Sequence, residues 1–549
     1  MSEAKYYLKP NVQIEPLVNL WHAYPFVIAP AATAMVTANY QMTTMKSYLQ
    51  MPMAHVAALK NPDMVGGPFI DYNGGRLKEI KALKESTENN SGELLEFAKG
   101  IKELNELLRQ KGKGYPLEDI YKEVPEVLRG YIELVYDLEH RATYRFIENL
   151  LYQSPLYDES TQSIALTLIS SDDRPFIFST PRLKDEHIVH LPIKFSDERI
   201  DKLGELREEP QTYAYIKELL SIPDEDDETF MSFLKEEPPQ KRPGFTEDGV
   251  RVSYYGHACV LLETKDVTVM TDLLISYKYE SNIPRYTFED LPESIDYVVI
   301  THCHHDHIVL ETLLQLRSKI KNIVVPKAGN GYLQDPSMRL ILENVGFENI
   351  IEIDEMERIN IPGGSITGLP FYGEHCDLNI RSKSTYAVKF DQGGTFLMVA
   401  DSSSINPDVY KNAHKAIGDI DMLFVGMECT GAPMSWSYGA FFTEPLERQL
   451  DQVRRSKGSD SATALELIDI FNPSHVYLYA MGSEPWLNYF MALQHGHSSN
   501  TDEECAKLLQ ICQDRGIESE RLFAKKEIIW TPETNKENQS LTLEEDVLK

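Results

Sequence analysis

Hydrophobic positions in the first 238 residues follow two different spacings. Leucines and isoleucines recur every three to four positions between residues 94 and 108, and residues 120–151 show a similar spacing. This spacing predicts amphipathic helices in both segments. Residues 163–169, 175–179 and 187–193 are rich in β-branched and aromatic residues and predict strands. The pattern therefore indicates an α+β N-terminal part.

The segment 223–249 interrupts both spacings. It reads PDEDDETF and then KEEPPQKRPGFTEDG, so it is first acidic and then rich in proline. Such a segment buries little apolar surface and breaks helices and strands alike. We place a domain boundary near Pro238, with one domain over residues 1–238 and another over 239–549.

Short apolar runs alternate with helical stretches in the second domain. This alternation is typical of an α/β protein in which two sheets pack between layers of helices. Eight segments are expected to form strands: 250–263, 267–273, 297–301, 323–325, 384–390, 395–400, 422–425 and 476–479.

The strongest chemical signal follows one of these predicted strands. Residues 297–307 read YVVITHCHHDH, in which a buried strand runs into the pattern HxHxDH, with His305 as an extra histidine. Alternation at the strand end directs His302 and His304 toward one metal ion, while the following turn directs Asp306 and His307 toward a second. The sequence therefore predicts a site for two metal ions.

Together with one aspartate before it and one after it, this motif resembles the metallo-β-lactamase superfamily, whose fold is an αββα sandwich. Asp272 ends the run VTVMTD, and Asp401 follows TFLMVA. The resemblance implies that Asp272 supports the ligand loop and that Asp401 bridges the two ions.

Two departures from the hydrolases of that superfamily concern the histidine ligands. Residues 371–378, FYGEHCDL, offer Glu374 and His375 where the hydrolases carry a third histidine. Residues 476–482, VYLYAMG, place Ala480 where they carry the last one. An oxygen-rich, histidine-poor set suits iron that binds dioxygen better than zinc that ionises water.

This combination resembles the diiron oxygenase branch of the fold, which includes the amino-acid β-hydroxylase of chloramphenicol biosynthesis. The opening, LKPNVQIEPLVNLWHAYPFVIAP, is also similar to that family's N-terminal domain, so the resemblance covers nearly the whole chain. It implies a monooxygenase of antibiotic and nonribosomal peptide biosynthesis. Such an enzyme uses two iron ions, O₂ and an external electron donor to hydroxylate the β-carbon of an amino acid tethered to a peptidyl carrier protein.

The same resemblance implies roles for individual residues. Glu428, in FVGMECTGAP, is expected to be an acid beside the metal ions, and His375 stays open as the alternative to Glu374. One iron is expected to be held by His302, His304 and Glu374, the other by Asp306 and His307, with Asp401 bridging.

Four other histidines are not expected to bind the metal ions. His257, in YYGHACV, is expected to be structural, and His475 is expected to face solvent. His495 and His497 lie after the ligand-bearing loops and are not expected to be ligands.

The alternative function is a binuclear zinc or manganese hydrolase. A degenerate binding module is disfavoured because six candidate ligands are present.

Composition narrows the classes of partner. The net charge of −31 argues against general binding to nucleic acid or to an anionic membrane. The sequence has no apolar run long enough to span a membrane and no secretory pattern at its start, so we expect a cytoplasmic protein. The six cysteines form no CxxC pair, and neither Cys303 nor Cys376 is expected to bind metal.

Two surfaces are candidates for contacts with other proteins. The separate N-terminal domain offers a surface for a homodimer or for partner docking. Arg454, Arg455 and Lys457, in VRRSKG, form the most compact basic cluster near the later loops of the metal domain. Because carrier proteins are usually acidic, this cluster is a candidate docking patch.

Overall fold

Two seven-stranded sheets form the centre of the second half of the chain in the computed structural model, which describes residues 4–492 and 500–531. The first sheet has the order β15-β14-β13-β12-β11-β10-β25. Its strands are β10 (Val250–Gly256), β11 (Cys259–Glu263), β12 (Thr268–Thr271), β13 (Tyr297–Val299), β14 (Ile323–Pro326), β15 (Ile350–Ile353) and β25 (Lys526–Trp530).

The second sheet has the order β16-β17-β18-β19-β20-β23-β24. Its strands are β16 (Arg358–Ile361), β17 (Gly364–Leu369), β18 (Thr385–Phe390), β19 (Gly394–Met398), β20 (Met422–Gly426), β23 (His475–Tyr479) and β24 (Glu518–Arg521). The predicted strands are therefore confirmed in all eight segments, and the first segment contains the hairpin of β10 and β11.

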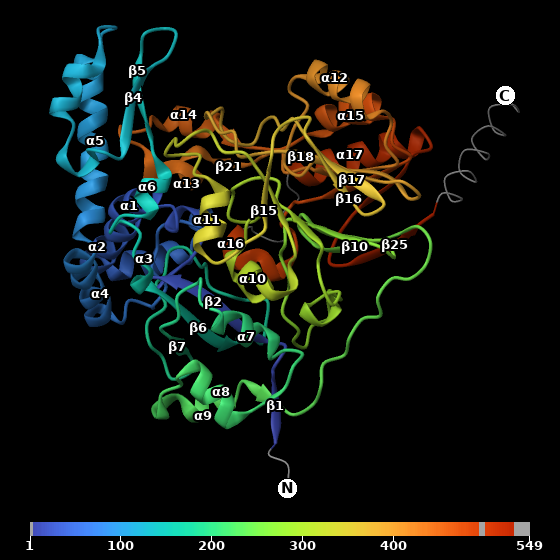
Figure 1. Cartoon of the computed structure of the whole chain (residues 1–549), viewed down its shortest axis with the longest axis horizontal. Helices are drawn as coiled ribbons and strands as arrows, with labels where there is room; N and C mark the ends of the chain where they lie inside the picture. Colours follow the sequence, from blue (N-terminus) through green and yellow to red (C-terminus); the bar gives the residue numbers. More distant parts are fainter. Residues whose placement is uncertain (1–3, 493–499, 532–549) are drawn as a thin grey trace, which may run out of the picture.

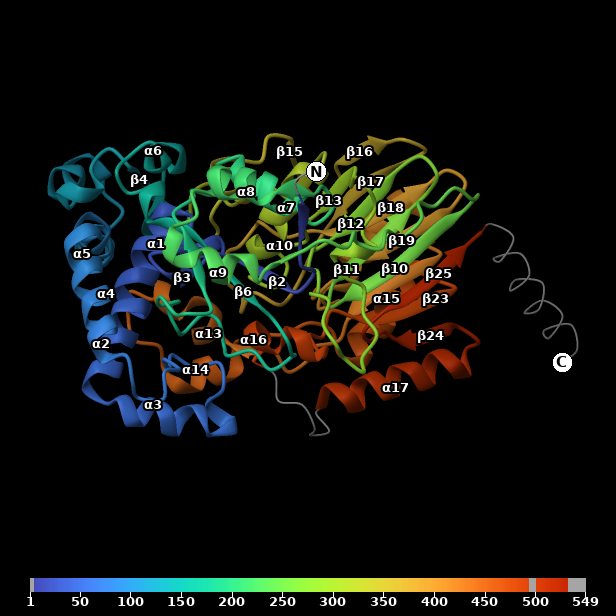
Figure 2. The same ribbon diagram turned by 90° about the horizontal axis from the view of Figure 1, so that it is seen from below.

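The two sheets stack face to face, as Figure 2 shows. Val252 and Val299 of the first sheet share one buried cluster with Val388, Phe396 and Phe424 of the second. Strands covered on both faces are expected to be apolar throughout, which is why they appear in the sequence as continuous runs rather than alternating ones.

Helices cover the outer faces of both sheets, so the predicted αββα sandwich is confirmed (Figure 1). Asp460 caps α15 by accepting a hydrogen bond from the Thr463 amide, and Leu467 and Phe471 of this helix pack in the cluster beneath the second sheet. The helices of this half are α10 (Leu310–Gln315), α11 (Met338–Asn344), α12 (Pro407–Ile417), α13 (Met434–Tyr438), α14 (Arg448–Val453), α15 (Ser461–Phe471), α16 (Asn488–Met491) and α17 (Asn500–Asp514).

The N-terminal part combines small sheets with helices, as predicted. Its sheets have the orders β8-β1-β9 and β3-β2-β6-β7, and β4 pairs with β5. The strands are β1 (Lys5–Leu8), β2 (Val12–Val18), β3 (Trp21–His22), β4 (Ile132–Tyr136), β5 (Ala142–Phe146), β6 (Gln162–Leu168), β7 (Val189–Leu191), β8 (Gln211–Thr212) and β9 (Leu234–Lys235). The helices are α1 (Pro30–Val36), α2 (Met42–Gln50), α3 (Pro52–Leu59), α4 (Leu77–Asn90), α5 (Gly92–Lys111), α6 (Glu148–Tyr152), α7 (Arg199–Glu205), α8 (Tyr213–Leu220) and α9 (Asp227–Met231).

The helix predicted around residues 94–108 is confirmed as α5. Ile101, Leu104 and Leu108 lie on its buried face at three- and four-residue spacing. Among residues 4–492 and 500–531, no helix is both long enough and apolar enough to cross a membrane.

The continuous helix predicted for residues 120–151 is wrong, because the central part of this segment is the hairpin of β4 and β5. Asp137 accepts hydrogen bonds from the amides of Glu139 and Arg141, and His140 adopts a left-handed φ of 62°. These contacts reverse the chain, so Ile132 and Leu134 alternate into the core with the period of a strand.

Two of the three predicted N-terminal strands are confirmed as β6 and β7. The third prediction, for residues 175–179, is wrong, because this segment forms no strand. Pro175 has no amide hydrogen to donate, and Ile177 donates a single hydrogen bond to the carbonyl of Tyr489.

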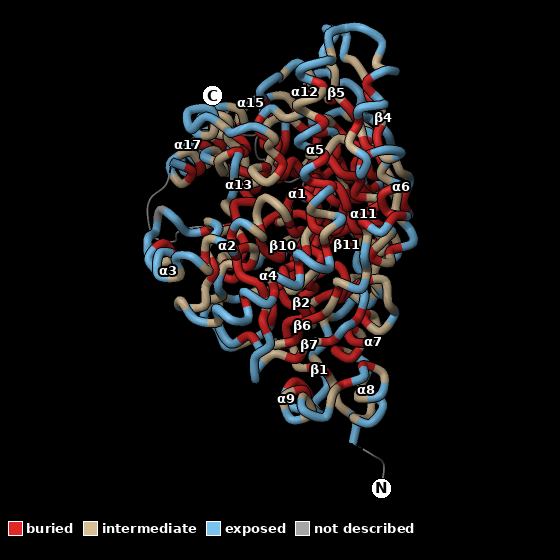
Figure 3. The backbone as a smooth tube through the Cα atoms, turned by 90° about the vertical axis from the view of Figure 1, so that its left-hand side faces the viewer, coloured by how far each residue is buried: buried red, intermediate tan, exposed pale blue. Residues whose placement is uncertain are grey.

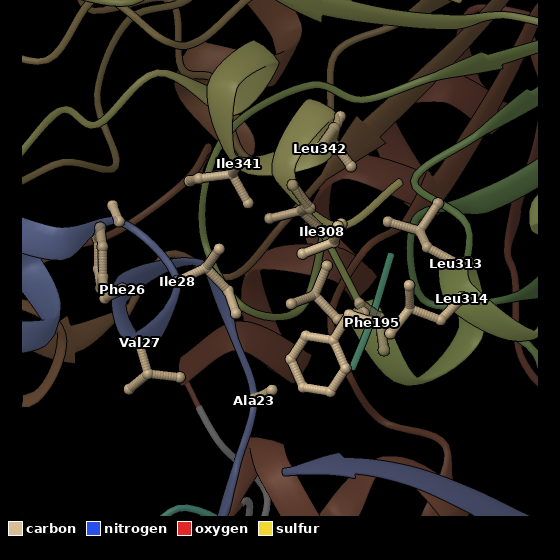
Figure 4. Close-up of a cluster of buried hydrophobic side chains, with 14 of the residues drawn as sticks. Ala23, Phe26, Val27, Ile28, Phe195, Ile308, Leu313, Leu314, Ile341 and Leu342 are labelled. Carbon is tan, nitrogen blue, oxygen red and sulfur yellow. The ribbon is translucent and has the colours of Figure 1, made fainter. Parts of the chain in front are cut away.

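One hydrophobic cluster runs through both parts of the chain. Figure 4 shows Ala23, Ile28 and Phe195 of the N-terminal part beside Ile308 and Leu313, which follow the histidine motif. In Figure 3 the buried backbone, drawn in red, is concentrated in the middle of the molecule. The division at residue 238 stays a prediction.

Candidate metal centre

The predicted metal site lies where several strands end at one edge of the two sheets. Asp272 follows β12, His302 follows β13, and Asp401 follows β19. Parallel pairing of β12 with β13 brings Asp272 beside the histidine motif. Asp272, Glu374 and Ala400 adopt left-handed φ values of 38°, 64° and 48°. Such backbone strain in residues other than glycine is common at functional sites.

His302, His304 and Glu374 form one compact group of buried side chains. The Nδ1 atom of His304 lies 2.6 Å from Oε1 of Glu374, and the Nε2 atom of His302 lies 3.8 Å from Oε2 of the same carboxylate. One ligand atom from each residue therefore lies within reach of a single metal ion.

His307 and Asp401 continue the cluster on the other side of His302. The Nε2 atom of His307 lies 3.1 Å from Oδ2 of Asp401, and that oxygen lies 3.9 Å from Nε2 of His302. Asp306 extends the group, with its Oδ2 3.6 Å from Nε2 of His307. Asp401 thus lies near both His302 and His307, and its bridging role stays a prediction.

Hydrogen bonds from neighbouring residues set the free nitrogen of each candidate histidine. His302 uses Nδ1 toward the Thr301 hydroxyl at 3.0 Å, and His304 uses Nε2 toward the Tyr438 hydroxyl at 2.7 Å. In each case the other nitrogen faces the carboxylates. Fixing the tautomer in this way is the usual role of the residues behind a metal-binding histidine.

Asp272 plays the same part for His307 and supports the ligand loop, in agreement with the prediction. Its Oδ2 accepts from Nδ1 of His307 at 2.9 Å and from the Thr301 hydroxyl at 2.7 Å, while Oδ1 accepts from the Thr301 amide at 2.8 Å. Asp272 and His307 are both fully buried. Asp272 therefore fixes both the side chain of His307 and the backbone before His302.

Of the two nitrogens of His257, Nε2 alone contacts the site. The Gly482 amide donates to its Nδ1 at 3.1 Å, which places the imidazole proton on Nε2. Nε2 lies 3.2 Å from Oδ2 of Asp306. Although one nitrogen of His257 lies within metal-binding reach of Asp306 and His307, this tautomer makes His257 a support for Asp306.

The electrostatics of the site are dominated by buried carboxylates. Burial raises the pKa of Asp401, and the negative charges of Glu374 and Asp306 add to that effect. Burial acts against the charged form of His307, but Asp306, Asp272 and Asp401 together hold its pKa well above the usual value. Such a cluster of negative charge attracts cations.

The residues present fit a pair of iron ions. Nε2 of His302, Oε2 of Glu374 and Oδ1 of Asp401 are buried without a hydrogen-bond partner, and buried polar atoms normally have one. The donor set consists of imidazole nitrogen and carboxylate oxygen. Neither Cys303 nor Cys376 belongs to a ligand group, and burial raises the pKa of their thiols to about 12 and about 11.

Glu374, and not His375, shares a ligand group with His302 and His304. The His375 ring stacks on the His304 ring with a centroid distance of 4.6 Å, and its Nδ1 lies 2.8 Å from Oε2 of Glu374. Burial lowers the pKa of His375 to about 4, although Glu374 opposes the shift. His375 therefore packs behind the group as a neutral ring.

Glu428 lies outside the three ligand groups. Its Oε1 accepts hydrogen bonds from the amides of Thr430 and Gly431 at 3.1 and 3.0 Å. Burial raises the pKa of Glu428, and the charge of Asp401 contributes to the shift. Its predicted role as an acid beside the metal ions stays a prediction.

The interpretation of His475 differs from the structure, whereas the basic cluster is not tested. His475, expected to face solvent, is buried against Trp530, and its Nε2 lies 3.0 Å from Glu518, because β23 is an inner strand next to β24. Arg454 and Arg455 are half-buried and donate to backbone carbonyls of nearby loops, and Lys457 is exposed, so the docking patch stays a prediction. His495 and His497 lie outside the described residues.

Tyr438 is a site residue that sequence reasoning missed. It ends α13, is fully buried, and lies far along the chain from His304. No spacing rule connects these residues, so only the folded chain reveals the contact.

Comparisons with known proteins agree with this geometry. Residues 7–238 match the model of the diiron non-heme beta-hydroxylase N-terminal domain, and residues 277–465 match that of the beta-lactamase superfamily domain. A protein of Streptomyces venezuelae, 4-amino-L-phenylalanyl-[CmlP-peptidyl-carrier-protein] 3-hydroxylase, is 33% identical over 95% of this chain and 99% of its own length.

Solved structures extend the likeness to three dimensions. The crystal structure of CmlA, a diiron beta-hydroxylase from Streptomyces venezuelae, matches with a TM-score of 0.89 and 33% identity over 96% of this chain and all of the other. A single-substitution mutant of the CmlA beta-hydroxylase matches with a TM-score of 0.88 and 32% identity over 95% of this chain and all of the other. The chain therefore belongs to the diiron non-heme β-hydroxylase family.

Proposed function

We propose that this enzyme hydroxylates the β-carbon of an amino acid held as a thioester on a peptidyl carrier protein. The observation that carries the proposal is the end-to-end match, at 33% identity, to a relative named as a 3-hydroxylase of a carrier-bound amino acid. One oxygen atom of O₂ enters the C–H bond, and the other leaves as water. The balance requires two electrons and two protons, so an external electron donor is part of the proposal.

We further propose that the predicted residues hold the two irons. The grouping of His302, His304 and Glu374 supports one site, and the position of Asp401 between His302 and His307 supports a bridging role. Bound iron supplies the reduction of O₂ that breaking an unactivated C–H bond requires. The complete assignment is His302, His304 and Glu374 for one iron, Asp306 and His307 for the other, and Asp401 for both.

The chain itself contributes orientation and the exclusion of water. Tyr438 and Asp272 hold the rings of His304 and His307, so the ligands are arranged before any metal binds. His302, His307 and Glu374 are buried, which keeps bulk solvent away from their ligand atoms. Ala480 carries only a methyl group at the position where the hydrolases have a histidine, so this position supplies no metal ligand.

The proposed reaction implies that a carrier protein binds this enzyme. A carrier-bound substrate gains binding energy from contacts remote from the reacting carbon, and these contacts orient that carbon.

We also propose that the enzyme is a homodimer through its N-terminal part. Size measurement by light scattering tests this, and a monomer at micromolar concentration contradicts it.

The test of the reaction compares one amino acid in two forms. Carrier-loaded and free amino acid are incubated with reduced iron-loaded enzyme and ¹⁸O₂, and mass spectrometry measures the oxygen gained. We expect incorporation into the loaded form and little into the free form, because only the loaded form carries the tether. Equal oxidation of both forms contradicts the requirement for a carrier.

The zinc or manganese hydrolase is the alternative, and metal analysis separates the two readings. The family match and the loss of a histidine at Ala480 disfavour a hydrolase. Protein expressed with added iron and purified without oxygen is expected to contain iron in both sites. Zinc in both sites under these conditions would leave the fold assignment intact and overturn the oxygenase.

A further inference from the structure

A short segment after α14 touches three loops that carry acidic residues of the site. This segment, residues 454–459 with the sequence RRSKGS, is called the strap below. Within it, β22 (Arg455–Ser456) pairs with β21 (Ala432–Pro433). The loops that it touches carry Glu374, Asp401 and Glu428.

The strap holds the Glu374 loop at three points. The carbonyl of Lys457 accepts from the Glu374 amide at 3.1 Å. Oγ of Ser456 lies 3.2 Å from Sγ of Cys376, and Nε of Arg454 donates to the Cys376 carbonyl at 3.0 Å. Nη2 of Arg454 donates to the same carbonyl at 2.5 Å. Both backbone and side chain of the strap therefore fix this loop.

The Glu374 loop needs such support because its backbone is strained. Glu374, Cys376 and Asp377 have φ values of 64°, 54° and 55°. The left-handed conformation is unfavourable for residues other than glycine, so surrounding contacts must hold it. The contacts of Arg454 and Lys457 fall at two of these residues, so the strap stabilises the conformation that directs Glu374 toward His302 and His304.

The strap also contacts the loops of Asp401 and Glu428. The Gly458 amide donates to the Glu428 carbonyl at 2.8 Å, and the Ser459 hydroxyl donates to the Ser402 carbonyl at 2.9 Å. A Cβ atom added to Gly458 would lie 3.1 Å from the Asp401 carbonyl oxygen, which is tighter than most real contacts. A side chain at this position would therefore push the Asp401 backbone away by a few tenths of an ångström.

Arg455 fixes the turn beyond Glu428 from the other side of the strap. Its Nε donates to the carbonyls of Thr430 and Gly431 at 2.9 and 3.1 Å. The amides of these same two residues donate to the Glu428 carboxylate. Arg455 thus fixes the turn whose amides hold the Glu428 carboxylate.

We infer that Arg454 and Arg455 are positioning residues for two acidic side chains of the site. Arg454 places the Glu374 carboxylate, and Arg455 places Glu428. Both guanidinium groups are used in hydrogen bonds to carbonyls within the fold. The inference deepens the proposed function, because it rests on Glu374 as a metal ligand.

The test is the variant Arg454→Met, which keeps a long apolar chain and removes the donors. Arg448→Met is the matched control, because Arg448 is exposed on the neighbouring helix α14. Release of iron to a chelator and the Mössbauer spectrum of the iron-loaded protein are measured. We expect Arg454→Met to release iron about tenfold faster or more and to alter the spectrum of one iron site. Arg448→Met is expected to match the wild type.

A second variant and a second metal distinguish a local effect on the site from a general folding defect. Arg454→Lys restores one donor and is expected to recover part of the iron retention, which a general folding defect does not predict. Loading with Co²⁺ gives an absorption spectrum that reports the ligands whatever reaction the enzyme catalyses. A normal Co²⁺ spectrum and normal metal release in both Arg454 variants overturn the inference and leave the hydroxylase untouched. If the wild-type protein binds Co²⁺ but no iron, an altered Co²⁺ spectrum of Arg454→Met supports the role of the strap, while the missing iron overturns the hydroxylase.

Discussion

Replacing Asp272 with asparagine tests how the fold holds the second half of the site. Asp272 accepts three hydrogen bonds, from the Thr301 amide, the Thr301 hydroxyl and Nδ1 of His307. Asparagine has nearly the same shape and tolerates the left-handed φ of 38° found at this position. The change therefore removes acceptor capacity and charge with little backbone strain.

The magnitude follows from the lost acceptor. The amide of asparagine keeps one oxygen, so at least one donor, either of Thr301 or of His307, faces an NH₂ group in a fully buried environment. Residues behind a metal ligand typically contribute 10- to 100-fold to metal affinity, which is about 1.4–2.8 kcal/mol. We expect Asp272→Asn to weaken iron binding by that range.

The assay is competition for ferrous iron against a chelator of known affinity, performed without oxygen. Asp296→Asn is the matched control. Asp296 also joins β12 to β13, by accepting from the amide and hydroxyl of Thr268, but it lies at the other end of these strands. This control is expected to lower stability without changing iron affinity.

Two results would refute the reasoning. Iron affinity of Asp272→Asn within twofold of the wild type would show that the orientation of His307 does not depend on Asp272. Equal losses in Asp272→Asn and Asp296→Asn would show that the effect comes from the strands in general and not from the contact with His307.

Three further predictions concern the ligands and the pH dependence of folding. His304→Ala and Asp401→Ala are each expected to deplete iron, because each removes a ligand without a replacement; elemental analysis that finds full iron in either variant contradicts the assignment. Glu374→Ala is expected to retain at least one metal and lose oxygen-dependent hydroxylation, whereas His375→Ala keeps more activity; the reverse order moves the ligand by one residue. Burial raises the pKa of Glu148 from 4.5 to about 7, so the folded state favours the neutral acid, and this group lowers stability as pH rises from about 4.5 to about 7, by up to roughly 3 kcal/mol. In urea titrations Glu148→Gln is expected to lose that part of the pH dependence, and an unchanged profile contradicts the pKa shift.

Part of the fold could be predicted because its signals are local. The eight segments expected to be strands in the second half are covered on both faces, so they appear as continuous apolar runs. The segment 120–151 failed because its apolar spacing fits a helix about as well as two short strands. The turn held by Asp137 makes this segment two strands, and the spacing of apolar residues gives no sign of that turn.

The sequence by itself determined the identity of most candidate ligands. HxHxDH places four ligand-type residues within six positions, and chain geometry at a strand end leaves few ways to arrange them. Glu374 beside His375 was a closer choice, and tertiary structure separates them by placing Glu374 with His302 and His304.

Only the tertiary structure decided what surrounds those ligands. Tyr438 behind His304 and Arg454 on the Glu374 loop come from segments far away along the chain. Two arginines in a row look like a solvated basic patch, because a sequence does not show which carbonyl groups will lie nearby. The physical reason is that hydrogen bonds between distant segments depend on how sheets and loops pack, whereas strand ends and short motifs depend on neighbours along the chain.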